Sequence, residues 1–291
     1  MKFENVRVYN FENALYGMRN PKNSWHLSDS EFGFRDLSDP NCGRAVAMEW
    51  AKNYDHNLVA DWVTDEDLAD DFRHWLYKNG ILAEAEVNSH NEQWGEVAFI
   101  GPRDMSLAKR LIESGPEHRK FMRQIFVTVD ITAPLYWWKE FDTYKVGTVA
   151  NSTSTMHKLT SKPITLDCFE IDDFENIPYP EDAQRPELKY NIDPDFVQMC
   201  LIPYLEYLRQ KFLETEDKTY WKELVRWLPE SWLQTRTVTM NYENLLSMCS
   251  KSQRRFHKLT EWSGTDEDRD SFIQFARRLP YAQDFIFIDE A

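Results

Sequence analysis

This sequence has little glycine and lacks the common catalytic signatures. Nine glycines and four cysteines occur in 291 residues. There is no GxGxxG, P-loop, GxSxG or HExxH motif, and no two cysteines form a CxxC pair. These absences remove the usual signatures of dinucleotide binding, nucleoside triphosphate hydrolysis, serine hydrolysis and zinc binding. We expect each of the four cysteines to be a small buried apolar residue; they are Cys42, Cys168, Cys200 and Cys249.

Long hydrophobic runs and an excess of positive charge are also lacking. No run approaches the roughly 20 apolar residues that a membrane helix needs, and the first segment, MKFENVRVYN, lacks a basic start followed by an apolar stretch. The sequence has 34 basic and 49 acidic residues, a formal charge of −15. We therefore expect a soluble cytoplasmic protein that does not bind nucleic-acid polymers or anionic membranes.

The composition predicts a large folded core. Apolar residues make up 42% of the chain and aromatic residues 14%, which excludes a disordered or fibrous protein. No internal repeat or Gly/Ser linker divides the sequence, so we predict a single domain over residues 1–291. We expect residues 1–100 to be an N-terminal extension or elaboration of this domain and residues 172–194 to form an acidic, proline-rich loop.

Periodicity predicts an α+β fold, with a mostly antiparallel sheet and packed helices. Residues Ile125, Val127, Val129 and Ile131 alternate as in a half-buried strand. The predicted strands are Val6–Tyr9, Gln124–Thr132 and Gln234–Asn241, and the predicted helices are Thr64–Gly80, Asp104–Ile112, Leu135–Tyr144, Asp193–Phe212, Trp221–Trp227, Leu245–Trp262 and Asp268–Leu279. We expect Asp104 to cap its helix and the aromatic run from Tyr136 through Trp137 to Trp138 to lie in the core.

Polar clusters at element junctions are the candidate sites. The first, Gly115–Gln124, contains His118, Arg119, Lys120 and Arg123; it is either an anion site or a solvated connection. The second, Thr143–Lys162, is rich in Ser and Thr, and its hydroxyl groups and backbone amides favour a phosphate site over a plain loop. The third, Asn241–Glu261, has charged residues at helical spacing, which favours an ordinary charged helix face.

The order of these segments resembles the flavin-dependent thymidylate synthase family. His118 matches the family histidine by position, and VDITAPLYWW matches a strand that ends in Ala133-Pro134. Leu228-Pro229 followed by Thr239-Met240-Asn241 matches the late family segment without a gap. The resemblance covers Leu107–Ser154 and Leu228–Trp262.

Several arginines of the family are replaced in this chain. The family motif RHRxxSxNExSxR falls, without a gap, on Thr143-Tyr144-Lys145 and Thr148; with one inserted residue, it aligns Asn151 and Ser154. Both registers are open. Glu243 stands where the family has an arginine, and a carboxylate there would repel a phosphate group unless it is paired or protonated. A later family arginine falls near Ser252, or its role has passed to Arg254 or Arg255.

The resemblance implies a function and a set of site residues. It implies a homotetramer that binds FAD between subunits and converts dUMP to dTMP with NADPH and methylenetetrahydrofolate, the flavin carrying the chemistry without a protein nucleophile. The implied flavin contacts are His118, Asn151, Asn241 and His257, and the implied contacts to the nucleotide phosphate are Lys145, Thr148, Ser154, Arg254 and Arg255. The alternative is a relative that keeps the fold but has lost this methylation: a nucleotide-binding or interaction protein, or an enzyme of modified pyrimidines.

Overall fold

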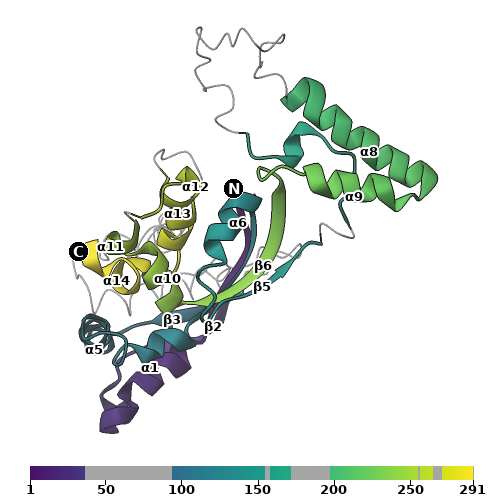
Figure 1. The fold of residues 1–291 in the computed structure, drawn as a ribbon. Helices are drawn as coiled ribbons and strands as arrows, with labels where there is room; N and C mark the ends of the chain where they lie inside the picture. The colour runs from purple at the N-terminus through teal and green to yellow at the C-terminus, as the bar shows by residue number, and fades with distance from the viewer. Residues whose placement is uncertain (37–93, 155–157, 172–196, 255, 265–270, 291) are drawn as a thin grey trace, which may run out of the picture. The chain divides into compact units, whose positions relative to one another are not determined.

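The structure is a computed structural model that describes residues 1–36, 94–154, 158–171, 197–254, 256–264 and 271–290. The predicted helix Thr64–Gly80, the predicted loop 172–194 and Cys42 lie outside the described residues. The described chain combines helices with an antiparallel sheet, so the predicted α+β class is confirmed (Figure 1).

The main sheet has four strands in the order β1-β4-β6-β5. Their bounds are Lys2–Tyr9 for β1, Phe126–Pro134 for β4, Leu233–Asn241 for β6 and Val149–Ser152 for β5. Side-chain hydrogen bonds pair Thr132 with Thr235 at 2.7 Å and Thr128 with Thr239 at 3.1 Å. Residue numbers rise along β4 as they fall along β6, so these two strands are antiparallel. A separate antiparallel pair joins β2 (Glu31–Asp36) to β3 (Trp94–Phe99).

Burial alternates along β4 as the sequence pattern predicts. Val127, Val129 and Ile131 are fully buried, and the residues between them are half-buried. Asp130 belongs to this half-buried face, where Thr237 and Asn5 donate hydrogen bonds that lower the pKa of its carboxyl group. The strand thus has one apolar and one polar face, as a period of two residues requires.

The chain divides into two compact units, and three of the boundaries between them fall inside β4, β5 and β6. The first unit contains Met1, Ile131–Thr143 and Asn151–Arg236, and the second contains Lys2–Asp130, Tyr144–Ala150 and Thr237–Ala291. The single domain expected from the sequence stays a prediction.

In the first unit, helix α6 (Leu135–Phe141) begins directly after the Ala133-Pro134 step. It ends three residues before the predicted Tyr144, because the chain turns at Asp142. Trp137 and Trp138 are buried, and the Nε1 of Trp138 donates to the carbonyl oxygens of Ala133 and Gln234 at 3.1 and 3.0 Å. The core prediction is confirmed for the two tryptophans, whereas Tyr136 is half-buried.

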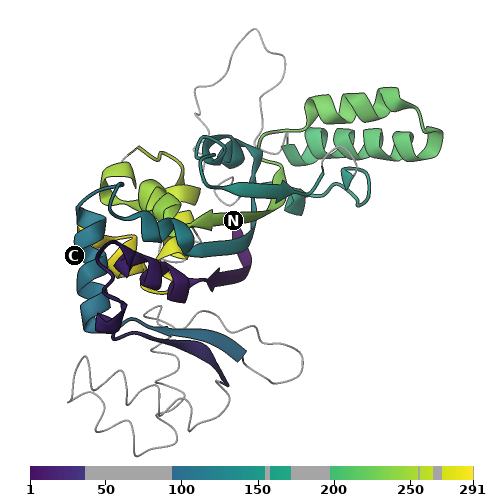
Figure 2. The same cartoon turned by 90° about the horizontal axis from the view of Figure 1, so that it is seen from below.

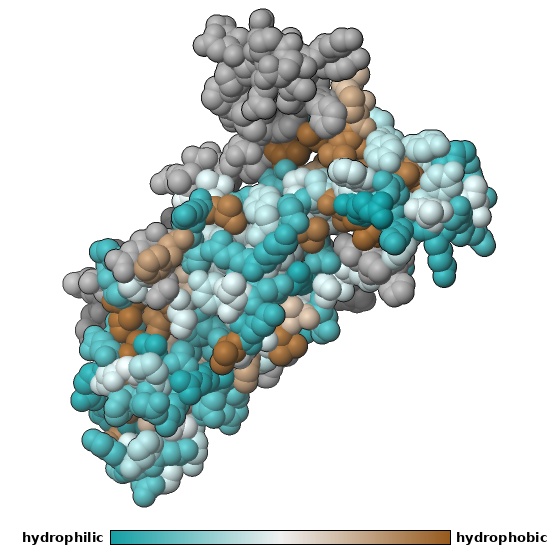
Figure 3. Space-filling model, viewed as in Figure 1, coloured by the Kyte–Doolittle hydropathy of each residue, from teal (hydrophilic) through white to brown (hydrophobic). Residues whose placement is uncertain are grey.

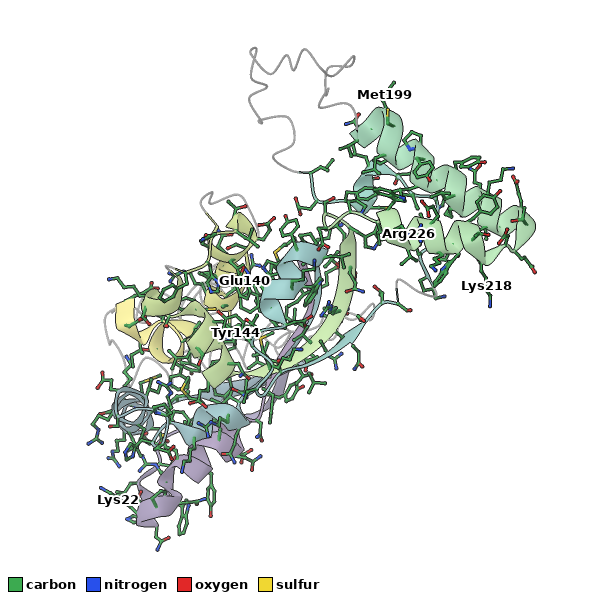
Figure 4. The ribbon with its side chains drawn as sticks, in the orientation of Figure 1. Lys22, Glu140, Tyr144, Met199, Lys218 and Arg226 are labelled. Carbon is green, nitrogen blue, oxygen red and sulfur yellow. The ribbon has the colours of Figure 1, made fainter. Side chains whose placement is uncertain are left out.

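A helical hairpin forms the rest of the first unit. Helices α8 (Ile202–Thr215) and α9 (Lys218–Trp227) lie side by side (Figures 1 and 2), and Glu216 makes the left-handed turn between them with φ 58°. The helices pack on a cluster of buried hydrophobic residues, namely Leu159, Ile164, Phe169, Ile202, Leu205, Leu208 and Leu224. Figure 4 labels Met199 near the start of α8 and Lys218 and Arg226 on α9. The predicted helix Trp221–Trp227 is confirmed as α9, which begins three residues earlier, at Lys218.

A π-helical turn, Val197–Leu201, precedes α8 and replaces the described part of the predicted helix start. Cys200 in this turn is exposed, Cys168 in the 3-10 turn Leu166–Cys168 is half-buried, and Cys249 is buried. The expectation of burial is thus confirmed for Cys249 and wrong for Cys200, since no residue of the π-helical turn is buried, and Cys168 is buried only in part. On the face turned to the viewer, Figure 3 shows hydrophobic side chains among hydrophilic ones.

Glu206 makes the stability of the hairpin depend on pH. Its carboxylate accepts hydrogen bonds from Arg209 at 2.7 and 2.8 Å, from the backbone N–H of Ile164 and from Gln210. The hydrogen bonds from Arg209 chiefly lower the pKa of Glu206 from 4.5 to about 2. A depressed pKa stabilises the folded state above the unfolded pKa, and this stabilisation is lost as the pH falls from 4.5 towards 2.

We expect the free energy of unfolding of the wild type to fall by about 1 kcal/mol more than that of Glu206→Gln between about pH 6 and pH 3, after allowance for solvent screening. Urea unfolding at a series of pH values measures this difference. The control is Glu214→Gln, which removes an exposed i,i+3 partner of Lys211. Equal pH slopes for the wild type and Glu206→Gln would contradict the role of Glu206.

The second unit is built from short helices around an aromatic core. These helices are α1 (Phe11–Arg19), α5 (Pro102–Glu113), α10 (Tyr242–Cys249), α11 (Lys251–Arg254), α12 (Thr260–Ser263), α13 (Phe272–Arg277) and α14 (Ala282–Phe285), with 3-10 turns at Asn20–Lys22, Trp25–Leu27, Lys120–Gln124 and Ile288–Glu290. Tyr242 packs edge-on against Phe11 with ring centroids 5.5 Å apart. Its hydroxyl donates to the carbonyl of Pro280 at 2.6 Å, and burial raises its pKa.

Asp104 does not cap α5, contrary to the prediction. The N-cap residue is Gly101, and Asp104 lies buried in the first turn. The cap comes from Asp29, whose carboxylate accepts hydrogen bonds from the backbone N–H groups of Arg103 and Asp104 at 2.9 and 3.1 Å. Because Asp29 accepts the hydrogen bonds of these N–H groups at the start of the helix, the Asp104 carboxylate can bind Arg19 instead.

The predicted C-terminal helix Leu245–Trp262 is also wrong, because the chain breaks it into shorter pieces. Helix α10 ends at Cys249, and Ser250 turns out of the helix with ψ 151°. Gly264, with φ 55°, ends α12. The predicted strand that precedes this region is confirmed as β6, whereas the expected helix Asp268–Leu279 is described only from Phe272 to Arg277.

Candidate functional site at the first turn of helix α10

The first turn of α10 is held by a reciprocal cap. The Asn241 side chain accepts from the backbone N–H of Asn244 at 3.0 Å, and the Asn244 side chain accepts from the backbone N–H of Asn241 at 3.1 Å. The backbone N–H of Tyr242 donates to the carbonyl of Ile125 at 3.1 Å. The Asn-x-x-Asn spacing therefore ends β6 and starts the helix within one residue, next to the beginning of β4.

Glu243 follows the cap and binds two arginines of the first basic cluster. Arg119 Nε lies 3.1 Å from one carboxylate oxygen, which also accepts from Arg123 Nη2 at 3.3 Å, and Arg123 Nε binds the other oxygen. The exposed fractions are 13% for Glu243, 20% for Arg119 and 48% for Arg123. One carboxylate thus joins the connection before β4 to the first turn of α10.

The ion pairs remove the electrostatic repulsion that was expected at Glu243. Burial raises the pKa of Glu243, but the hydrogen bonds and charges of Arg123 and Arg119 outweigh burial and lower it overall. The hydrogen bond from Glu243 in turn raises the pKa of Arg123. Glu243 is therefore ionised and paired, and the repulsion expected of an isolated carboxylate is cancelled by two guanidinium charges.

The segment Tyr144–Thr148 of the second cluster lies against the same turn (Figure 4, Tyr144). Asn244 Nδ2 donates to the carbonyl of Val146 at 2.6 Å. At Gly147, with φ 83°, a Cβ atom would lie 3.0 Å from side-chain atoms of both Asn241 and Asn244, so the close approach and the left-handed backbone both require glycine. Lys145 is exposed, and Thr148 Oγ1 donates to the carbonyl of Tyr144 at 2.7 Å.

His257 packs against Tyr144 of this segment and against Trp262. Its ring stacks on Trp262 with centroids 4.3 Å apart and an interplanar angle of 5°, and Tyr144 lies 6.3 Å from it. Its Nε2 lies 2.9 Å from the carbonyl oxygen of Met248. His257 is 8% exposed, and its position supports Tyr144 rather than presenting a free ring to a ligand.

The structure gathers some of the predicted site residues and leaves others elsewhere. Lys145, Thr148 and Asn241 belong to the α10 turn, and His118 is exposed next to Arg119. Asn151, which is exposed in β5, and Ser154 belong to the other unit. Arg254 ends α11, and Arg255 lies outside the described residues.

The sequence placed Arg119 and Arg123 in a candidate anion cluster, but it did not single out Asn244 or Gly147. The Asn241-x-x-Asn244 spacing was a usable signal for the cap. The pairing of the arginines with Glu243 had no local signal. Among the described residues no cluster of His, Cys, Asp or Glu could hold a metal ion, and no helix in the described part of the chain has the length and apolarity to cross a membrane.

Comparisons with known proteins give structural likenesses of low similarity. No family model matches the chain, and no curated protein matches it. Two structures of the flavin-dependent thymidylate synthase ThyX from Helicobacter pylori, with FAD and dUMP, are 14% and 13% identical, with TM-scores of 0.38 and 0.39. They align with 89% and 90% of this chain and 98% of their own.

The UMP/dUMP methylase PolB from Streptomyces cacaoi, bound with 5-Br UMP, is 14% identical with a TM-score of 0.35. It aligns with 50% of this chain and 63% of its own. These TM-scores are below 0.5, so the likenesses carry no conclusion about the function of this chain.

Proposed function

We propose that this chain is an enzyme that methylates a uridine nucleotide, with the chemistry of the family it resembles: dUMP to dTMP, with FAD, NADPH and methylenetetrahydrofolate. The supporting observation is that three polar clusters, far apart in the sequence, contribute to one helical turn. Glu243 on this turn binds Arg119 and Arg123, and Asn244 binds Val146, next to Lys145. The proposal includes a cytoplasmic homotetramer.

Of the residues that the resemblance implies for FAD, some have positions that fit this role and others do not. His118 and Asn151 have exposed side chains. Asn241 uses its oxygen in the cap, and its Nδ2 has no hydrogen-bond partner within the described residues, so it remains a donor. His257 is buried against Trp262 and fits a supporting role. When bound, FAD would supply the redox chemistry.

For the nucleotide phosphate, the proposal keeps the residues that the resemblance implies. Lys145 is exposed and offers a positive charge. Thr148 donates its hydroxyl hydrogen to the carbonyl of Tyr144, so its hydroxyl would have to leave this hydrogen bond in order to donate to a phosphate oxygen. Ser154, Arg254 and Arg255 complete the proposed set. Ser154 belongs to the register with one inserted residue, whereas Arg254 or Arg255 would replace the family arginine that falls near Ser252.

The first test is flavin absorbance of the purified chain. We expect absorbance that is present on purification or rises on titration with FAD, and a rise in melting temperature with dUMP but not with deoxyuridine, because a ligand bound only by the folded state stabilises it. A colourless protein that gains no flavin absorbance contradicts the flavin-dependent activity.

A second candidate is a nucleotide-binding protein without methylation. The observation that favours it is Glu243, which stands in place of a family arginine and is held in two ion pairs. Restored growth of a thymidine-requiring host that lacks its own synthase would contradict this candidate. FAD binding without such growth separates an enzyme of modified pyrimidines from a binding protein.

A further inference from the structure

We infer that Arg119 and Arg123, held in place by Glu243, form a binding site for a phosphate group. The resemblance assigns no role to either arginine. The inference rests on the proposed function only for the identity of the nucleotide that would carry the phosphate group. The anion site itself rests on the geometry of three side chains.

The ion pairs leave several guanidinium donors available. Glu243 engages Nε of Arg119 and both Nε and Nη2 of Arg123. Within the described residues, Nη1 and Nη2 of Arg119 and Nη1 of Arg123 make no hydrogen bond. The two Arg119 nitrogens are also absent from the buried polar atoms of the described chain that lack a partner, so solvent reaches them. A ligand with several acceptor oxygens can therefore reach these N–H groups.

The cluster keeps a net positive charge. Two guanidinium groups and one carboxylate leave one positive charge, because the pKa of Glu243 is lowered and it stays ionised. The neighbouring Lys120 pairs with Glu117 at 3.5 Å and adds no net charge. In a chain of formal charge −15, such a local positive site favours a small anion over a large polyanion.

The fixed geometry suits phosphate in particular. A guanidinium group presents two parallel N–H donors that match two oxygens of a phosphate group, which a lysine ammonium does not reproduce. Arg119 is 20% exposed and fixed through Nε, so little side-chain entropy remains to be lost on binding. Glu243 is thus a positioning residue, and the arginines are the binding residues.

Isothermal titration calorimetry at low ionic strength tests this site with inorganic phosphate, dUMP and deoxyuridine as probes. We expect the full-length wild type to bind phosphate and dUMP but not deoxyuridine. Arg119→Gln should weaken binding of inorganic phosphate about tenfold or more. Arg119→Lys keeps the charge and the possibility of pairing with Glu243, and should lose about threefold because the fork is gone.

The matched control is Arg110→Gln, which makes the same change in net charge at an exposed arginine that bonds only to the carbonyl of Ser106 in the described chain. It should change phosphate affinity by less than about twofold, because Arg110 shares no hydrogen bond or ion pair with Arg119, Arg123 or Glu243 in the described chain. Circular dichroism and urea unfolding of each variant establish that it is folded.

No binding of inorganic phosphate by the wild type, or equal affinities for the wild type and folded Arg119→Gln, would overturn the inference. An equal loss in Arg110→Gln would overturn it too, because the effect would then follow net charge. Phosphate binding that depends on Arg119, without flavin binding or methylation, would support the anion site and contradict the proposed function. The two proposals therefore fail separately.

Discussion

Asp104→Ala is expected to lower the free energy of unfolding by about 3–5 kcal/mol, the usual cost of removing one partner from a buried ion pair. Asp104 is fully buried, and Arg19, with 5% of its side chain exposed, donates to it through Nε at 2.5 Å. Ser28 and Ser30 donate to its second oxygen at 2.6 Å. Alanine would leave a buried guanidinium and two hydroxyl groups without their acceptor. Urea unfolding followed by circular dichroism measures the loss.

Glu113→Ala is the control for this prediction. Glu113 is the last residue of the same helix α5 and is exposed, so its removal should change stability by less than about 0.5 kcal/mol. Asp104→Asn keeps the shape and an acceptor oxygen and should fall between the two. An unfolding free energy of Asp104→Ala within about 1 kcal/mol of the wild type would show that the network contributes little.

Trp138→Ala is expected to cost about 3–5 kcal/mol, as for other large-to-small changes of a buried aromatic residue. Trp138 is 1% exposed and packs edge-on against Trp137 with centroids 4.9 Å apart. The Arg236 guanidinium lies 4.2 Å from its ring centroid. The substitution therefore removes apolar contacts, a cation–π contact and an indole N–H donor together. The midpoint and slope of urea unfolding measure the change.

Trp138→Phe separates these contributions. It keeps an aromatic ring in the core but removes the N–H that donates to Ala133 and Gln234. The expected cost is about 1–3 kcal/mol, mainly for the two carbonyl groups that lose a donor. If Trp138→Phe were as destabilising as Trp138→Ala, the hydrogen bonds rather than the packing would dominate at this position.

Elements with a local pattern could be predicted from the sequence. The alternation from Ile125 to Ile131 identified β4, because side chains in a strand point to opposite faces in turn. The Ala133-Pro134 step identified the start of α6, because proline fits the start of a helix and not its interior. The C-terminal helix was wrong because its apolar spacing continues across Ser250, where the backbone leaves the helix.

The candidate site, too, could be predicted from the sequence only in part. The sequence determined which residue types were available: a basic cluster around Arg119, a hydroxyl-rich segment after Thr143, and a cap at Asn241. Only the tertiary structure decided that Glu243 pairs with Arg119 and Arg123, which are 124 and 120 residues away, and that Asp29 caps a helix 74 residues later. Periodicity and capping depend on residues within a few positions of each other, whereas a charge finds its partner only when folding closes the long loop between them.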